Sequence, residues 1–323
     1  MLDIKEYSDI NDCKILWESL WPKHCIFDLW EVRECFAKSF DRKIKFLVAE
    51  QDGHPAGLLP LTYIEESENY AFFPGETWMG KTWLEQNKIP ALNPGVRREL
   101  LSCIPGKANL RYLEPEYIVG DLLTVETDEI GYILRPGHYG YSFESYLQEF
   151  SGKSRKKLAA EASCLDARGI SYRHDHFPDV ASLFRLNHDA FGESSYFGDP
   201  RFLSSFESLI AWLWDNRLLR ITTVIIGDSI AAVDVGAIFN NGYTVLAGGT
   251  NPDFKGVAKL INFHHIEWAF RERLETVDFL CGDFGWKERF HLSPRPLYKI
   301  HSPDTTKAAL ITESSDAGLS LVR

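Results

Sequence analysis

Asp234 is the side chain whose position is best suited to chemistry. It is the only ionisable residue in Ile230–Phe239, an apolar and β-branched run that predicts a strand. A tight turn at Asn241-Gly242 would place Asp234 opposite Gly249 on the next strand. A carboxylate there could take a proton from an amine or hydroxyl nucleophile, or bind a substrate amine. The alternative is a structural aspartate that hydrogen-bonds the backbone or faces outward at a sheet edge.

An anion site is predicted where the next strand leads into a helix. Tyr243–Gly249 predicts the strand, and Val257–Arg273 shows helical periodicity after a loop that ends at Gly256. The first backbone N–H groups of a helix lack partners within the helix, and the helix dipole favours negative charge there. Gly248 and Gly249 put no side chain beside the strand. The sequence therefore predicts a ligand slot along the strand, with a phosphate site at its mouth.

The helix predicted at Lys153–Arg168 has cations where acids are expected. Lys153, Arg155, Lys156 and Lys157 lie in its first turns, although the helix dipole prefers negative charge at that end. A nearby anionic ligand or partner would offset this cost. The alternative is a solvated basic face.

Other polar residues give fewer indications of function. Their hydroxyls make Tyr196 and Tyr243 candidate general acids. His264 and His265 are adjacent on a predicted helix and point to different faces, and His174-Asp175-His176 has no evident third ligand. The sequence therefore predicts no metal site.

The chain is predicted to consist of two mixed α/β halves. In the second half, strands are predicted at Leu219–Ile226, Ile230–Phe239, Tyr243–Gly249 and Val277–Cys281. The first half repeats the order helix, helix, hairpin. Only the order of the elements, and not the amino-acid sequence, therefore indicates an internal duplication. Arg135-Pro136-Gly137 is interpreted as the crossover, which predicts domains at residues 1–137 and 138–323. An aromatic-rich stretch, residues 66–94, forms either a substrate groove or the core of an irregular insertion.

Several pieces of the second half resemble a known family. They are Ser154–Leu158 at a helix start, Gly227–Ala232, Gly248–Pro252, and Asp278–Asp283 followed by Lys287 and Phe290. Their order, with a strand–loop–helix at its centre, is similar to the GNAT acyltransferase fold. Their amino-acid sequences resemble those of the FemAB-like tandem-GNAT proteins of the CelD/BcsL type, which are associated with cellulose and exopolysaccharide genes. The resemblance implies tandem GNAT-like domains, each a mixed, mainly antiparallel sheet flanked by helices, with a degenerate N-terminal domain and a C-terminal acyltransferase domain.

The resemblance also implies roles for individual residues. An acyl-CoA donor would be bound by Gly248, Gly249, Thr250, Lys255, Gly256, Val257, Ala258 and Lys259, and residues 251–259 keep part of the family's pyrophosphate-binding pattern. Asp283 joins Asp234 and Tyr243 as a catalytic candidate and would orient the acceptor. Lys287 would pair with a phosphate or carboxylate, or would instead lock a turn with Asp283. The candidate substrate-binding residues are Arg155, Lys156, Tyr196, Trp286 and Lys287.

Composition limits the function further. The net charge of −11 argues against a broad nucleic-acid surface. No apolar run is long enough to span a bilayer, and the polar, acidic start is unlike a secretory signal. The six cysteines are scattered and form no C-x-x-C pair, which indicates reduced thiols rather than a disulfide framework. A cytoplasmic protein is therefore expected.

These observations predict an N- or O-acyltransferase. It would move an acyl group from acyl-CoA, used as a co-substrate, to an amine or hydroxyl of a small molecule, sugar or cell-envelope precursor, with no permanently bound cofactor. One alternative is a Fem-type aminoacyl-tRNA-dependent transferase, in which the cations of residues 153–157 would meet the nucleic acid; the acidic net charge argues against it. Another is a catalytically inactive tandem-GNAT scaffold, which the partial pyrophosphate pattern supports.

Overall fold

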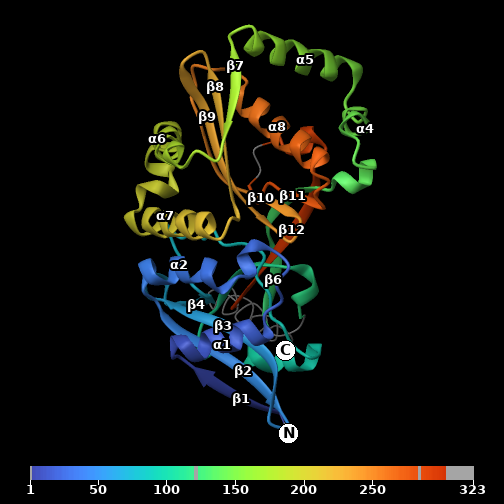
Figure 1. Cartoon of the computed structure of the whole chain (residues 1–323). Coiled ribbons are helices and arrows are strands. Elements are labelled where there is room, and N and C mark those ends of the chain that lie inside the picture. Colours follow the sequence, from blue (N-terminus) through green and yellow to red (C-terminus); the bar gives the residue numbers. More distant parts are fainter. Residues whose placement is uncertain (1, 120–122, 283–284, 303–323) are drawn as a thin grey trace, which may run out of the picture.

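Two sheets carry the fold (Figure 1). The structure, a computed structural model, describes residues 2–119, 123–282 and 285–302. The smaller sheet has the strand order β1-β2-β3-β4, and the larger has the order β5-β12-β6-β11-β10-β9-β8-β7. The first four strands are β1 (Leu2–Tyr7), β2 (Lys43–Gln51), β3 (His54–Ile64) and β4 (Asn69–Phe72). Those of the larger sheet are β5 (Asn109–Leu113), β6 (Thr124–Leu134), β7 (Ile170–His174), β8 (Leu219–Ile226), β9 (Ser229–Phe239), β10 (Gly242–Thr250), β11 (Thr276–Asp278) and β12 (Ser293–His301).

The predicted fold class, mixed α/β with mainly antiparallel sheets flanked by helices, is confirmed. Among the described strands, neighbours are antiparallel except β10 and β11. The larger sheet takes β5 and β6 from before residue 137, and β12 lies between them. The division into residues 1–137 and 138–323 therefore stays a prediction, since one sheet contains strands from both ranges.

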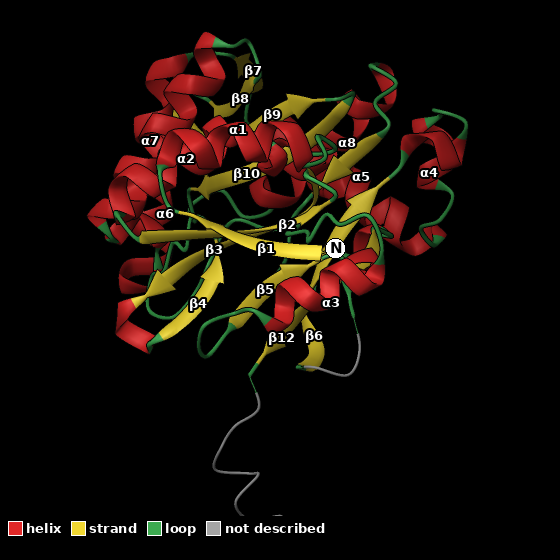
Figure 2. Cartoon of the chain, turned by 90° about the horizontal axis from the view of Figure 1, so that it is seen from below, coloured by secondary structure: helices red, strands yellow, loops and turns green. Residues whose placement is uncertain are grey.

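Helices cover both faces of the smaller sheet (Figure 2). On one face, Trp17 of α1 (Ile10–Leu20) and Trp30 of α2 (Trp30–Phe40) pack on Phe46 and Val48 of β2. On the other face, Leu47 and Leu59 pack with α3 (Pro94–Ser102) and with β5 and β12 of the larger sheet. Successive strand residues point to opposite faces, so β2 joins both layers into one body.

The larger sheet is also covered on both faces. Val233 and Val235 of β9 share a core with Leu183 of α6 (Val180–Phe191) and Leu209 of α7 (Pro200–Asp215). Ala232 packs instead with α8 (Val257–Arg271), on the opposite face. By alternation along the strand, Asp234 lies on the side of α8. The remaining helices, α4 (Phe143–Leu147) and α5 (Gly152–Asp166), lie outside α8 (Figure 1).

The turn between β9 and β10 differs from the sequence prediction. Asn240 and Asn241, rather than Asn241-Gly242, form the two-residue turn, and both have left-handed φ values of 47° and 56°. A bulge between Val245 and Ala247 then shifts the register once more. Asp234 therefore lies opposite Gly248, and the predicted pairing with Gly249 is wrong by one residue.

The irregular segment between β4 and α3 is held by two buried cations. Arg33 of α2 donates to the carbonyl oxygen of Phe73 at 3.0 Å and to Asn87 Oδ1 at 2.8 Å. The Lys88 ammonium lies 2.7 Å from the Asp28 carboxylate, and both side chains are fully buried. Although burial alone would raise the pKa of Asp28, the Lys88 ammonium and hydrogen bonds such as that from Trp21 lower it. These contacts fix a segment that has no regular structure of its own.

We predict that Lys88→Met lowers the free energy of unfolding by about 3 kcal/mol, because it leaves the Asp28 carboxylate buried without its cation. Denaturant titration would measure the change. Lys38→Met is the matched control, since the exposed pair of Lys38 with Glu34 contributes less than about 0.5 kcal/mol. Equal, small effects of both substitutions would contradict a structural role for the buried pair.

Candidate active site

The site begins where two parallel strands separate. β10 and β11 pair at only three positions, from Gly242↔Thr276 to Thr244↔Asp278. Beyond Asp278 the chain stays with β6, because the N–H of Phe279 donates to the carbonyl oxygen of Tyr132 and the N–H of Tyr132 donates to that of Leu280. β10 instead continues alongside β9 to Thr250. The two strands therefore diverge from a common base.

A cavity of about 680 Å³ fills this divergence. Residues 245–250 of β10 line one side, and residues 279–282 line the other. Its remaining walls come from α6 and α8 and, from the first half of the chain, from residues near Trp83 and Tyr112. The cavity thus lies where the two halves meet, and its volume is typical of a small-molecule site.

Asp234 lines this cavity and is almost fully buried. Its Oδ2 lies 3.0 Å from Nε2 of His265 on α8, and the His265 side chain is completely buried. From the sequence, His265 was considered only as a metal ligand and excluded. A signal was present, because Val257, Ile261 and His265 recur at helical spacing and Val257 and Ile261 pack against β8 and β9.

The glycines opposite Asp234 are required by packing. A Cβ on Gly248 would lie 2.2 Å from Asp234 Oδ1, and one on Gly249 would lie 2.7 Å from the carbonyl oxygen of Leu183 on α6. Both residues line the cavity, as does Thr250. Asn187 of α6, which the sequence did not indicate, donates from Nδ2 to the carbonyl oxygen of Gly248 at 2.9 Å. Asp234 and α6 thus occupy the space beside the two glycines, and this wall of the cavity is fixed from both sides.

Tyr243 does not reach the cavity. Its side chain is fully buried, its ring centroid lies 5.3 Å from that of His265, and its hydroxyl has no hydrogen-bond partner among the described residues. Burial raises the pKa of Tyr243 well above its ordinary value. Tyr243 therefore supports the Asp234–His265 pair from behind and does not line the cavity.

An acidic cluster from distant parts of the chain forms the opposite wall. Glu85, which lines the cavity, accepts a hydrogen bond from the Cys281 N–H at 2.7 Å and lies 3.4 Å from the Arg295 guanidinium. The same guanidinium pairs with Asp278 at 2.7 Å, and Gln86 donates to that carboxylate at 3.0 Å. The Arg295 guanidinium thus lies within ion-pair distance of both the Glu85 and the Asp278 carboxyl groups. The sequence analysis named neither Glu85 nor Arg295, because no local pattern places them together.

A second cluster repeats this charge balance at the cavity wall. Arg111 pairs with Asp128 at 2.7 Å and with Glu129 at 3.2 Å. Glu129 lines the cavity and also accepts a hydrogen bond from the Tyr112 hydroxyl at 3.1 Å. Each cluster has two carboxyl groups for one guanidinium, and Glu85 and Glu129 present theirs to the cavity.

The segment after β11 holds the remaining predicted residues. Lys287 is buried, and its ammonium donates to the carbonyl oxygens of Phe279, Leu280 and Cys281 at 2.9, 2.9 and 2.8 Å. Burial lowers the pKa of Lys287. Its three donors therefore serve the turn, and Trp286 lines the cavity beside it. Asp283 lies outside the described residues.

Aromatic side chains close the cavity on the side of α7. Tyr196 lies with its ring 4.8 Å from that of Trp78 and 5.0 Å from that of Phe202, and burial raises its pKa to about 12. Trp83 packs between Phe36 of α2 and Phe206 of α7 at 5.4 Å from each ring. The aromatic-rich stretch of residues 66–94 thus supplies both core residues and a wall of the cavity.

The residues predicted to bind the donor's phosphates divide between two sides of α8. Ala258 lines the cavity, whereas Gly256 and Lys259 face a separate groove and Val257 is core. Gly256 precedes the helix with a φ of 93°, a conformation that favours glycine. Lys255 is exposed. Arg155 also borders the groove, and Lys156 is exposed on α5.

Metal and membrane sites were also considered. Within the described ranges, no group of three or more His, Cys, Asp or Glu side chains could hold a metal ion. None of the helices in these ranges combines the length and apolar character needed to cross a membrane.

Comparisons with known proteins agree with this geometry. Residues 152–288 match the family model of an acetyltransferase (GNAT) domain. No curated protein has a significantly similar sequence. The fold is similar to that of L-PGS from Bacillus licheniformis, with a TM-score of 0.58, 11% identity, and coverage of 96% of this chain and 98% of the other. It is similar to FemX, with a TM-score of 0.56, 9% identity, and coverage of 95% and 99%.

A third similar structure is the C-terminal domain of a putative lysylphosphatidylglycerol synthetase from Agrobacterium fabrum. Its TM-score is 0.54, at 10% identity and with coverage of 90% of this chain and 94% of the other. The family match identifies residues 152–288 as an acyltransferase domain of the GNAT type. The chain as a whole has a fold similar to those of L-PGS and FemX.

Glu85 gives this site a specific pH dependence. Burial, reinforced by Asp278 and opposed by Arg295, raises the pKa of Glu85 from 4.5 to about 7. Between these two values the unfolded chain loses the proton while the folded protein keeps it, so this group makes the fold less stable as the pH rises. We predict that Glu85→Gln removes this loss. The difference in unfolding free energy between the variant and wild type should therefore rise by about 3 kcal/mol, in favour of the variant, from pH 4.5 to pH 8.

Denaturant titrations at several pH values would test this prediction. Glu99→Gln, an exposed position on α3, is the matched control and should give a constant difference from wild type. If the stability of wild type and of Glu85→Gln changed with pH in parallel, the pKa of Glu85 would not be raised in the folded protein, which would contradict the prediction.

Proposed function

We propose that the protein moves an acyl group from acyl-CoA to an amine or hydroxyl acceptor inside the cavity. The separation of β10 and β11 is the observation that carries this proposal. Past Thr244, in the described chain, β10 has a strand neighbour only on the side of β9. Its N–H groups at the bulge between Val245 and Ala247 could therefore polarise an acyl carbonyl in the gap.

Asp234 is proposed as the general base. It lies in the wall of the gap, opposite Gly248, and could accept the proton that the acceptor loses as it attacks the acyl carbonyl. His265 would hold the carboxylate in position through the 3.0 Å contact to Oδ2, leaving Oδ1 beside Gly248. The support is this geometry together with the burial of both side chains.

The charge of the cavity favours an amine acceptor. The carboxyl groups of Asp234, Glu85 and Glu129 line it from three directions. Of the two lysines in its lining, Lys287 donates to backbone carbonyls and Lys81 lies over the Trp78 ring. An amine can hydrogen-bond to the carboxyl groups, whereas a carboxylate facing Asp234 and Glu129 would be repelled. A cytoplasmic location and an acceptor from exopolysaccharide or cell-envelope synthesis form part of the proposal.

A second candidate function keeps the site and changes the donor. In this version the donor is an aminoacyl-tRNA, and the acidic cavity would receive the amino group of the aminoacyl ester. One structure of similar fold comes from a putative lysylphosphatidylglycerol synthetase, and that name describes an enzyme whose product is an aminoacyl ester. The exposed cations at the start of α5 would then contact the nucleic acid.

We predict that Asp234→Asn lowers the rate of acyl transfer at least about 100-fold, because the amide cannot accept the proton. The substitution keeps the shape that packs against Gly248, so the protein should remain folded. Asp215→Asn, at the exposed end of α7, is the control and should leave the rate unchanged. Acyl transfer by Asp234→Asn at the wild-type rate would contradict the assignment of Asp234 as the general base.

The donor can be identified by thermal-shift titration with acetyl-CoA, a longer acyl-CoA, free CoA and a stable aminoacyl-adenosine analogue. A ligand of the folded state adds about 2.7 kcal/mol of stability at a hundredfold excess over its dissociation constant. We expect a shift with the CoA compounds that is lost in Ala258→Glu, which puts a carboxylate at the cavity side of the α8 start.

Ala160→Glu, exposed on α5, is the control for this titration and should keep the shift. A shift with the adenosine analogue alone would replace acyl-CoA with the aminoacyl-tRNA donor. No shift with any of these compounds would contradict both versions of the proposal.

A further inference from the structure

A second hollow lies on the other side of α8 from the catalytic cavity. We call it the α5–α8 groove; its volume is about 480 Å³. Residues 258, 261 and 262 of α8 face the cavity, whereas residues 256, 259, 260, 263, 264 and 267 face the groove. These two sets follow helical spacing on different faces. The α5–α8 groove is therefore separate from the proposed acyl-transfer site.

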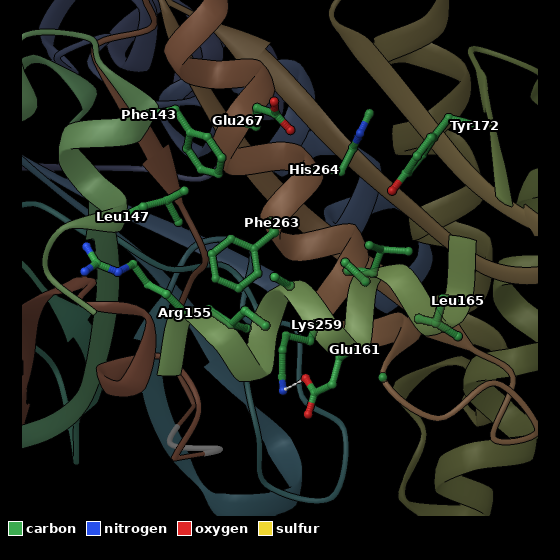
Figure 3. A pocket seen from close by; sticks show the side chains of 15 residues that line it. Phe143, Leu147, Arg155, Glu161, Leu165, Tyr172, Lys259, Phe263, His264 and Glu267 are labelled. Atoms are coloured by element: carbon green, nitrogen blue, oxygen red, sulfur yellow. Dashed lines mark hydrogen bonds and ion pairs between the residues drawn. The ribbon is translucent and has the colours of Figure 1, made fainter. Parts of the chain in front are cut away.

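The walls of the groove are mainly apolar and only partly buried. Phe143 and Leu147 of α4, Leu158 of α5, and Leu260 and Phe263 of α8 are half-buried around it. Figure 3 shows Phe143, Leu147 and Phe263 gathered at one end and Leu165 and Tyr172 at the other. Apolar side chains that meet in a hollow without filling it gain stability when a ligand removes them from water.

The packing of α5 also indicates a missing occupant. This helix has 15 residues, yet Leu165 is the only one that is buried. Most helical stability in proteins comes from packing of an apolar face. Leu158, Ala159 and Ala162 line the groove and supply such a face, but α5 packs against α8 mainly near Leu165. A ligand in the groove would be covered by α5 on one side and by α8 on the other.

The two ends of the groove differ in charge. Arg155 lines it near Leu147 (Figure 3), and its guanidinium donates to the neutral amide of Gln148. Among the described residues, neither Arg155 nor the neighbouring Lys153 and Lys156 lies within ion-pair distance of a carboxylate. These cations surround the first turn of α5, where the helix dipole adds further positive potential.

The other ionisable groups along the groove differ from Arg155. Lys259 is paired with Glu161 across its floor (Figure 3). His264, at the end near Tyr172, has its pKa lowered to about 3 by burial and is neutral. Glu267 also lines the groove and lies beside Phe143 (Figure 3).

We propose that the α5–α8 groove binds a fatty acid, with the alkyl chain along the apolar walls and the carboxylate beside Arg155 and the lysines of the first turn of α5. Arg155 near Leu147 and the neutral His264 near Tyr172 favour this orientation, and a volume of about 480 Å³ suits one alkyl chain. Binding would cover the apolar face of α5 and hold this helix against α8.

Calorimetric titration of the full-length protein with dodecanoate, below its critical micelle concentration, tests the proposal. Wild type should bind dodecanoate. Ala162→Trp, which fills the groove, should bind at least about tenfold more weakly, because the indole displaces the chain from the apolar wall. Ala160→Trp is the matched control: it is exposed on the same helix, lies outside the groove, and should bind as wild type does.

The orientation is tested with the head group. Dodecyltrimethylammonium has the same chain with a cationic head and should bind wild type at least about tenfold more weakly than dodecanoate. Arg155→Glu should remove that preference. Equal binding of the two amphiphiles to wild type, or unchanged dodecanoate binding by Ala162→Trp, would overturn the proposal. Binding only to vesicles of anionic phospholipid, and not to monomeric dodecanoate, would replace it with a membrane surface.

Discussion

The separation of β10 from β11 is the constraint on which the rest of the site depends. Asp278 ends β11 because its Oδ1 accepts the Leu280 N–H at 2.9 Å and Leu280 adopts a left-handed φ of 58°. The chain then follows β6, while β10 continues along β9. A parallel pair of full length would close the gap and leave no room beside Asp234. The cavity therefore follows from how one short strand ends.

The partners that hold this ending come from distant parts of the chain. Asp278 is bound by Arg295 of β12 and by Gln86 from the segment between β4 and α3. That segment is itself fixed by Arg33 and by the buried Asp28–Lys88 pair. The two halves thus share one polar network, and the acidic wall of the cavity is a by-product of this coupling. Substitutions far from the cavity are expected to act through it.

Sequence reasoning succeeded where the signal was local. The apolar, β-branched run Ile230–Phe239 correctly indicated a strand, and the structure buries Asp234, for which the sequence had left an outward-facing position open. The sequence prediction placed the β9–β10 turn one residue late, because Asn240 and Asn241 both adopt left-handed backbone conformations. The β-bulge could not be recognised from the sequence. Glu85 and Arg295 could not be found, since they lie 210 positions apart and meet only through the sheet. His265 could have been found from its position on the α8 face that packs on the sheet.

Acyl transfer as proposed requires the donor's acyl group to lie in the gap between β10 and residues 279–282. A crystal structure with a non-hydrolysable ketone analogue of the donor would show where this group lies. We predict the ketone oxygen within hydrogen-bonding distance of the β10 backbone at residues 245–247, with Asp234 facing the carbonyl carbon. A ketone placed elsewhere, for example in the α5–α8 groove with the gap unchanged, would contradict it.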